Sequence, residues 1–279
     1  MSNLFKRVLL IISVFCIHGL LYANPSLEKK PKLYAIVIGI GEYPKANISS
    51  KFAKNDAIAI YQRLKAQIGY TYIEGNIQLL NRPEQTTHTS IQQAFDDVKS
   101  KIKPTDTFVM FIAGEADRVD EEYYLLTSKT QDLSAKQIQS TGVSVSQLKN
   151  LIANIPTAYK FILIDTPMSD YVMKTTDLFT THNIKTCKSG MILTAGRYAI
   201  DDGFRGHSLF TYAVLDAFSG IADQNKNGFI ESNELAQYVE AAISMIAKQA
   251  FKRQQTPYID KCGDKSLLKS KQVFISKTP

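Results

Sequence analysis

The sequence lacks the long membrane-spanning run, the basic stripe and the glycine-rich fingerprint that would each assign a chain to a familiar class of protein. Its N-terminal apolar run, Val8–Leu21, is short for a permanent membrane span and contains His18. Its densest basic stretch, Lys29–Lys32, has no accompanying stripe of arginine and aromatic residues, so nucleic-acid binding is not favoured. Gly39 and Gly41 lack the third glycine of a dinucleotide-binding site. The chain also has no internal repeat and no low-complexity tract.

Residues 1–23 have the pattern of a secretory signal peptide. Lys6 and Arg7 form a positive start, the apolar run follows, and Leu-Tyr-Ala provides a cleavage sequence before Asn24. We therefore expect a secreted or periplasmic protein with no stable membrane insertion after cleavage, and an uncleaved anchor is the alternative.

Cys16 does not indicate a lipid-anchored protein, because Phe15 is too large for the small residue that normally precedes a lipid-modified cysteine. The mature chain would then consist of a flexible lead-in over residues 24–32 and a single domain over residues 33–279. The formal net charge of +7 is spread along the chain, which predicts a solvated basic surface.

The exported chain would keep two cysteines, Cys187 and Cys262. In an oxidising compartment such a pair forms one disulfide or remains as two thiols, and the sequence leaves this open. Of the three remaining histidines, His88 and His182 lie in polar segments and are expected in exposed loops. His207 directly precedes a predicted helix and is expected to mark its entry.

Short apolar runs alternate with amphipathic segments along the chain. The run Phe161–Ile164 suits a strand buried on both faces of a parallel sheet. The other predicted strands are Leu33–Ile40, Asn76–Leu80, Thr107–Ile112, Glu121–Thr127, Met191–Ala195 and Gln272–Ser276. The predicted helices are Lys51–Lys65, Ser90–Ile102, Val145–Ile155, Ser208–Ser219 and Ser232–Lys248. This alternation predicts an α/β fold with a mainly parallel sheet and helices on both faces.

Two of the predicted strands end in a similar way. Phe161–Ile164 is followed by Asp165 and a turn, and Thr107–Ile112 is followed by Ala-Gly-Glu-Ala. Because chemistry in open α/β sheets is usually placed beyond the carboxyl ends of the strands, these two turns are the first candidates for a functional site.

These strand ends resemble those of the caspase-like cysteine peptidases, the superfamily of caspases, metacaspases and their bacterial relatives. In that family the earlier strand ends in Ser/Ala-Gly-His-Gly, which supplies the catalytic histidine. The later strand ends in Asp-Ala-Cys-His-Ser-Gly, which supplies the nucleophile. On this sequence the histidine position falls on Glu115 and the cysteine position on Pro167, while Gly114, Asp165 and Ser169 match the family.

The resemblance continues, in the family's order, over nearly all of the mature chain, from Leu33 to about Tyr258. The further matches are a first strand and turn ending in Gly-x-x-x-Tyr, then Asn55-Asp56-Ala57, Tyr124-Leu125-Leu126, Gly206-His207 and Gln255-Thr256-Pro257. The resemblance implies the three-layer caspase-like fold.

The two replacements imply that the catalytic dyad is missing. A cysteine peptidase needs a thiolate beside an imidazole. Pro167 offers neither a nucleophilic atom nor an N–H group for an oxyanion hole. A carboxylate such as that of Glu115 is normally a weak base at neutral pH. The resemblance thus implies a pseudopeptidase that binds a protein or peptide at the former active-site cleft, or that has a structural role.

An enzyme is the alternative. It would be an active caspase-like cysteine endopeptidase with a displaced nucleophile, such as Cys187 or Cys262, or another hydrolase that uses carboxylates. The acidic turn that begins at Glu115 leaves two interpretations, a site for a basic peptide or cation and a solvated loop partly neutralised by Arg118. Its other acidic residues are Asp117, Asp120, Glu121 and Glu122.

A second motif, Asp223–Glu234, fits the twelve-residue EF-hand calcium loop at each diagnostic position. Gly228 permits the sharp turn, and Ile230 is expected to point inward. The candidate calcium ligands are the side chains of Asp223, Asn225, Asn227, Glu234 and, through water, Glu231, together with the carbonyl group of Phe229.

This loop contains only three carboxylates, and no second EF-hand loop is present to pair with it. We therefore expect weak calcium binding, with a dissociation constant on the order of 10⁻⁴ M or weaker, and a stabilising role. The alternative is a polar loop held by its own hydrogen bonds.

Overall fold

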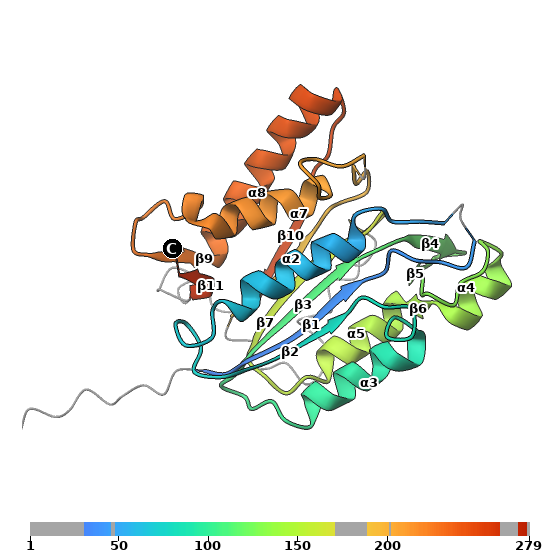
Figure 1. Cartoon of the computed structure of the whole chain (residues 1–279), viewed down its shortest axis with the longest axis horizontal. Coiled ribbons are helices and arrows are strands. Elements are labelled where there is room, and N and C mark those ends of the chain that lie inside the picture. Colours follow the sequence, from blue (N-terminus) through green and yellow to red (C-terminus); the bar gives the residue numbers. More distant parts are fainter. Residues whose placement is uncertain (1–30, 46–47, 171–188, 201, 263–272, 278–279) are drawn as a thin grey trace, which may run out of the picture. The chain divides into compact units, whose positions relative to one another are not determined.

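The computed structural model describes residues 31–45, 48–170, 189–200, 202–262 and 273–277. Its main feature is a six-stranded sheet with the strand order β10-β8-β7-β3-β1-β2 (Figure 1). The strands are β1 (Leu33–Gly39), β2 (Gly75–Leu80), β3 (Thr107–Ala113), β7 (Tyr159–Asp165), β8 (Ser189–Thr194) and β10 (Tyr258–Cys262). All neighbours are parallel except β10, which pairs with β8 in the antiparallel direction. The predicted α/β fold with a mainly parallel sheet is confirmed.

Helices cover both faces of this sheet. They are α2 (Ala53–Lys65), α3 (His88–Lys99), α5 (Val145–Ala153), α7 (Leu209–Asp216) and α8 (Ser232–Ile246). A further helix, α4 (Ala135–Thr141), packs away from this sheet, where Ile138 contacts a small cluster with Val119 and Leu126. Two of the helices continue into π-helical turns, α7 into η1 (Ala217–Ile221) and α8 into η2 (Ala247–Phe251). Among the described residues, no helix is both long enough and apolar enough to cross a membrane.

Two hydrophobic cores lie on opposite faces of the sheet. On one face, α2, α7 and α8 pack with alternate strand residues such as Val37, Phe111 and Leu163. On the other face, α3 and α5 pack with the residues between them, such as Met110 and Ile162. This alternation follows from the two-residue period of a strand, and it explains why the buried strands read as continuous apolar runs.

Gly39 lets α2 lie close to the end of β1. A Cβ atom at this position would lie 2.4 Å from the carbonyl oxygen of Ala53 and 2.6 Å from the Cβ atom of Ala57. Gly39 therefore serves the packing of a helix against a strand, which agrees with its exclusion from a dinucleotide-binding site.

Most predicted elements are present, with small shifts at their ends. The predicted helix Ser90–Ile102 begins two residues earlier and ends at Lys99. His88 is therefore the first residue of α3, and its prediction as a loop residue is wrong. His182 and Cys187 lie outside the described residues, whereas Cys262 ends β10 opposite Gly190 of β8.

Several short elements had no counterpart in the prediction. They are α4, the strand β10, and the strands β4 (Ala116–Val119), β6 (Val143–Ser144) and β9 (Phe229–Glu231). The predicted strand Glu121–Thr127 is β5 (Glu122–Leu125), which lies between β4 and β6 in a small antiparallel sheet. The predicted last strand is β11 (Val273–Lys277), and it pairs with β9 instead of the main sheet.

Candidate functional site

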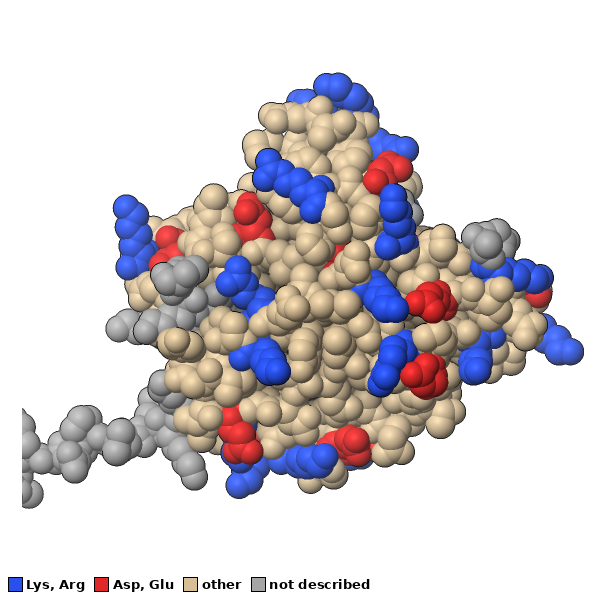
Figure 2. Space-filling view, viewed as in Figure 1, with Lys and Arg blue, Asp and Glu red and all other residues tan. Residues whose placement is uncertain are grey.

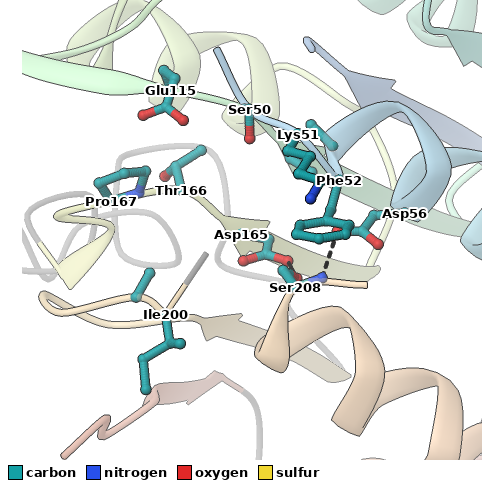
Figure 3. Close-up of a pocket in the computed structure, with 14 residues that line it drawn as sticks. Ser50, Lys51, Phe52, Asp56, Glu115, Asp165, Thr166, Pro167, Ile200 and Ser208 are labelled. Carbon is teal, nitrogen blue, oxygen red and sulfur yellow. Dashed lines mark hydrogen bonds between the residues drawn. The ribbon is translucent and has the colours of Figure 1, made fainter. Parts of the chain in front are cut away.

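The carboxyl ends of β3 and β7 lie side by side, as the sequence predicted. The parallel register pairs Ala113 with Asp165, and the N–H of Gly114 donates to the carbonyl oxygen of Asp165 at 3.3 Å. Glu115 follows β3 and Pro167 follows β7, and both line one pocket (Figure 3). The structure therefore brings these two residues together at the edge of the sheet.

The backbone of Glu115 is held by two hydrogen bonds. Its N–H donates to the hydroxyl oxygen of Tyr43 at 2.9 Å, and its carbonyl accepts from the N–H of Leu126 at 3.0 Å. Burial raises the pKa of the Tyr43 phenol, so this hydroxyl remains neutral at physiological pH. Tyr43 thereby connects the turn after β1 to the turn after β3.

The turn after β7 is fixed by side-chain hydrogen bonds. The hydroxyl groups of Thr166 and Tyr123 lie 2.6 Å apart, and both side chains are buried. The hydroxyl of Ser169 donates to the carbonyl of Gly196 at 3.2 Å and accepts from its N–H at 3.0 Å. Ser169, which matches the family in sequence, therefore ties the turn after β7 to the turn after β8.

A cluster of buried polar groups lies on the other side of the pocket. The Asp165 carboxyl group accepts hydrogen bonds from the hydroxyl groups of Ser208 and Thr211, the latter at 2.6 Å. The N–H of Ser208 donates to Oδ2 of Asp56 at 3.2 Å (Figure 3). Nδ1 of His207 lies 2.6 Å from Oδ1 of Asp56. One helix entry thus contacts a carboxyl group from β7 and another from α2.

The two carboxyl groups have unusual proton affinities. Burial, and after it the charge of Asp56, raises the pKa of Asp165 to about 7, although its hydrogen bonds to Ser208 and Thr211 act in the opposite direction. Burial also raises the pKa of Asp56 to about 7 and lowers the pKa of His207. Low solvent access therefore favours the neutral forms of both carboxyl groups and of the imidazole.

The prediction that His207 marks a helix entry is confirmed, because it directly precedes Ser208, the N-cap of α7. Its contact with Asp56 was not predicted. The only signals for it were the two short family matches Asn55-Asp56-Ala57 and Gly206-His207. Asp56 and His207 are 151 positions apart in the sequence, and nothing in the local pattern indicates that they meet.

The pocket between these groups is almost filled. Its free volume of about 20 Å³ is room for roughly one water molecule. Its described lining includes Lys51, Phe52 and Ile200 in addition to the residues at the strand ends, and none of the lining residues is a cysteine or a histidine. Among the described residues, the lining therefore offers carboxyl and hydroxyl groups but neither a thiol nor an imidazole.

The acidic turn that begins at Glu115 is an ordered hairpin and not an irregular loop, while the predicted role of Arg118 as a partial counter-charge is confirmed. The strands β4 and β5 form it, and Asp120 occupies the turn with a φ of 55°. The guanidinium of Arg118 donates to Glu121 at 3.1 Å, and Glu122 accepts from the N–H of Ser146 at 2.9 Å. The antiparallel ladder thus orders this segment, and several of its carboxylates already accept hydrogen bonds.

The predicted calcium loop is held by its own hydrogen bonds. Asp223 accepts from the N–H groups of Asn227 at 3.1 Å and Gly228 at 2.9 Å. Glu234 accepts from the N–H groups of Gln224 and Asn225 with one oxygen, and from Glu231 with the other. The loop geometry also matches the motif, because Gly228 has a φ of 83° and Ile230 is fully buried.

The described residues contain no group of three or more histidine, cysteine, aspartate or glutamate side chains arranged to hold a metal ion. Ligation in this loop would therefore also use the side chains of Asn225 and Asn227 and the carbonyl of Phe229. The amide of Asn227 donates to Glu231 at 3.0 Å, and its side-chain oxygen accepts from the N–H of Phe229 at 2.9 Å. Oxygen atoms of the required kinds are present, but a cation would compete with these hydrogen bonds.

Comparisons with known proteins agree with the fold. A family model described as the caspase domain matches residues 32–266. Among solved structures, a structural-genomics target protein from Geobacter sulfurreducens aligns with a TM-score of 0.58 and 14% sequence identity. The alignment covers 89% of this chain and 100% of that chain, and at this identity the likeness concerns the fold alone. A comparison with curated proteins found no match.

Proposed function

Because the chain belongs to the caspase-domain family, we propose that it is an exported member without peptidase activity, which acts as a protein- or peptide-binding or structural module. The observation that supports this best is the pair of residues at the two strand ends. Glu115 stands at the family's histidine position and Pro167 at its cysteine position, and both line the same pocket. Neither residue can replace the thiolate–imidazole pair of a cysteine peptidase.

The surrounding contacts also favour a structural use of this region. Thr166 and Ser169 contribute their hydroxyl groups to hydrogen bonds within the protein, and Pro167 between them has no N–H group to offer a substrate. A free volume of about 20 Å³ does not accommodate a substrate side chain. A peptide or protein partner would therefore contact the rim of the pocket, which we define by three lining residues that are exposed or partly exposed, Lys51, Glu115 and Pro167 (labelled in Figure 3).

An enzyme with a displaced catalytic group is the competing function. Asp56 and Asp165 are the specific observation in its favour, because a carboxyl group with a pKa of about 7 suits acid–base chemistry at neutral pH. Both carboxyl groups, however, already accept hydrogen bonds from the entry to α7, and neither has a thiol beside it among the pocket-lining residues. We therefore favour the inactive module.

Hydrolysis assays separate these two functions. The purified mature chain, beginning at Asn24, is incubated with fluorogenic peptide libraries that carry Arg, Lys or Asp before the scissile bond. We expect no turnover above the buffer control. Turnover that disappears in Cys187→Ser but persists in the matched variant Cys262→Ser would contradict the proposal.

Binding at the rim is tested with the same libraries in uncleavable, fluorescently labelled form. Anisotropy should report binding that weakens when the charge at the rim is reversed in Glu115→Lys or Lys51→Glu. Lys226→Glu, in the calcium loop, is a matched charge reversal outside the pocket lining and should leave binding unchanged. No binding to any library member, together with unchanged thermal stability in both rim variants, would contradict both the binding and the structural role.

We also propose that Asp223–Glu234 binds calcium weakly and stabilises the fold. The supporting observations are the twelve-residue spacing, the positive φ of Gly228, and the oxygen-bearing side chains at each expected position. The ion would supply positive charge to an acidic loop that joins η1 to α8.

Export is proposed from the signal sequence, and N-terminal sequencing of the protein recovered outside the cytoplasm should begin at Asn24.

The distribution of charge gives no support for a nucleic-acid partner. Lys and Arg side chains are spread over the visible face in Figure 2, with Asp and Glu between them, and they do not form one stripe. A polyanion would require such a stripe for tight binding.

A further inference from the structure

One edge of the main sheet is open. β2 is the outermost strand, and β1 is its only strand neighbour among the described residues (Figure 1). Gly75–Leu80 is partly exposed along most of its length and contains neither a proline nor a charged residue. Natural proteins usually protect such edges with prolines, charges or a covering segment. The sequence of β2 has neither of the first two of these protective features.

The hydrogen-bond pattern shows which backbone groups point outward. The N–H of Leu33 donates to the carbonyl of Glu74 at 2.9 Å, and Leu33 is opposite Gly75 in the register. In a parallel ladder, successive residues direct their backbone groups to alternate sides. Ile77 and Leu79 therefore direct their N–H and C=O groups away from β1, to the open edge.

The side chains of β2 separate into two chemically distinct rows. Ile77 and Leu79 pack against the core on the α2 side. Gln78 lies on the α3 side, where its amide donates to the carbonyl of Ala94 at 3.4 Å. A groove between β2 and α3 also contains the amide side chain of Gln93. One face of the edge is thus apolar, and the other carries amides that both donate and accept hydrogen bonds.

A two-fold axis perpendicular to the sheet would bring each row of β2 side chains against the same row of a second copy. Such an axis keeps each face of β2 on the same side in both copies. When the axis passes through Gln78, Ile77 would meet Leu79 of the partner subunit on the apolar face, and Gln78 would meet Gln78 of the partner subunit on the amide face. A strand from an unrelated protein would satisfy both faces only if it carried the same alternation.

The charges at the two ends of β2 fix the register. An exposed ion pair precedes the strand, with Lys32 Nζ 2.5 Å from Glu74 Oε2. A second exposed pair follows it, with Arg82 Nε 3.3 Å from Glu84 Oε1. Glu74 and Arg82 are equally distant from Gln78 along the sequence. Antiparallel pairing centred on Gln78 therefore places Glu74 opposite Arg82 of the partner subunit.

We propose that the protein forms a two-fold symmetric dimer through antiparallel pairing of β2 with β2 of a second copy, centred on Gln78. The pairing joins the two six-stranded sheets into one continuous sheet. It gives the outward backbone groups of Ile77 and Leu79 hydrogen-bond partners. At each end of the paired β2 strands, Glu74 of one copy lies opposite Arg82 of the other, so charges of opposite sign face one another. Edge pairing buries little surface, so the dimer is reversible and depends on protein concentration.

Charge reversal tests the register. Sedimentation velocity over a wide concentration range should show a monomer–dimer equilibrium for the unaltered chain. Arg82→Glu and Glu74→Arg should each weaken the dimer about tenfold or more, because each places like charges opposite one another. The double variant Glu74→Arg with Arg82→Glu should restore it. Lys45→Glu, which breaks the exposed pair with Asp132, is the matched control and should dimerise normally.

Two further measurements test whether the two copies meet along β2. Leu79→Pro removes an outward N–H that β1 does not use, so it should abolish the dimer while leaving the circular dichroism spectrum unchanged. Hydrogen exchange of the Gly75–Leu80 amides should slow as protein concentration rises. A chain that is monomeric at all concentrations, or a dimer that is unaffected by Leu79→Pro and by both charge reversals, would overturn the proposal.

Discussion

The hydroxyl group of Ser208 donates a hydrogen bond to the buried carboxyl group of Asp165, and this contact joins the central strand β7 to the N-terminus of α7. The same hydroxyl accepts a hydrogen bond from the N–H of Thr211 at 3.1 Å, as the N-cap of the helix. The N–H of Ser208 in turn binds Asp56 of α2. One serine thus connects three elements that are far apart in the sequence, beside the pocket at the strand ends.

Removal of this hydroxyl should destabilise the protein more than the loss of a helix cap alone. Ser208→Ala removes a cap and a donor to a buried carboxyl group, for a combined cost of roughly 2–3 kcal/mol in the free energy of unfolding. Urea unfolding measures this change in the free energy of unfolding. The matched control is Ser134→Ala, which removes the exposed N-cap of α4 and should cost only about 1 kcal/mol. Equal losses in the two variants would show that the contact with Asp165 contributes nothing.

The buried carboxyl groups should make stability fall as pH rises towards neutrality. Asp165 has a pKa of about 7 in the folded protein, whereas an unfolded aspartate has a pKa of about 3.9. Between these values the folded state binds more protons than the unfolded state, so the contribution of Asp165 is largest below about pH 4 and is lost by about pH 7. Asp165→Asn keeps a hydrogen-bond acceptor and removes the titration, so its unfolding free energy should fall less steeply over this range.

The control for this pH dependence is Asp132→Asn. Asp132 is partly exposed, and hydrogen bonds from Ser134 lower its pKa, so it acts in the opposite direction. Replacing Asp132 should leave the decline of the unfolding free energy between pH 4 and 7 in place or make it slightly steeper. A slope that is identical in Asp165→Asn and the unaltered chain would show that Asp165 is ionised throughout this range.

The periodic pattern of apolar residues in the sequence predicted the sheet and helix layers of this fold but not its short strands. The helices α2 and α5 and the buried strands β1, β3 and β7 have apolar patterns long enough to identify them. The strands β4 and β6 do not, because Ala116–Val119 and Val143–Ser144 contain no continuous apolar or aromatic run, and they are strands because they pair with β5. β10 likewise carries charged residues in its interior and is a strand because it pairs with β8.

The candidate site was predicted in part. Glu115 and Pro167 could be placed together because parallel strands end at the same edge of a sheet. The cluster of Asp56, Asp165 and Ser208 could not, because its members come from three elements whose packing angles the sequence does not determine. The near absence of free space in the pocket also depends on that packing.

Lys160 should make stability rise with pH above neutrality. Its side chain is buried, and its ammonium group donates to the carbonyls of Ile152 at 3.0 Å and Ala153 at 3.3 Å, at the C-terminal end of α5. Burial lowers its pKa to about 8, from about 10.4 in the unfolded chain. The unfolded state therefore binds more protons between these values, and the unfolding free energy should increase over that range.

Urea unfolding between pH 8 and 9.5 measures this effect, below the range in which tyrosines normally ionise. Lys160→Met should remove the increase, and Lys99→Met, which changes an exposed residue at the end of α3, is the control. If the unaltered chain and Lys160→Met gain stability in parallel over this range, Lys160 does not titrate there.

Calcium should stabilise the protein through Asp223–Glu234, and the hydrogen bonds of Glu234 determine how this must be tested. Glu234 accepts from three backbone N–H groups in the absence of any ion, so a variant at this position lowers the melting temperature by itself. The informative quantity is therefore the change in melting temperature on adding millimolar calcium. We expect a rise of a few degrees for the unaltered chain. We expect no rise for Glu234→Gln, which keeps a hydrogen-bond acceptor but loses the charge and bidentate ligation.

The matched control is Glu240→Gln, an exposed glutamate six residues further along α8, which should keep the full response to calcium. Magnesium at the same concentration should have a smaller effect, because it requires a tighter octahedral arrangement than a loop with two asparagine ligands provides. A response that is the same for Glu234→Gln and Glu240→Gln would place any calcium effect elsewhere on the surface. The loop would then be one that its own hydrogen bonds hold in place.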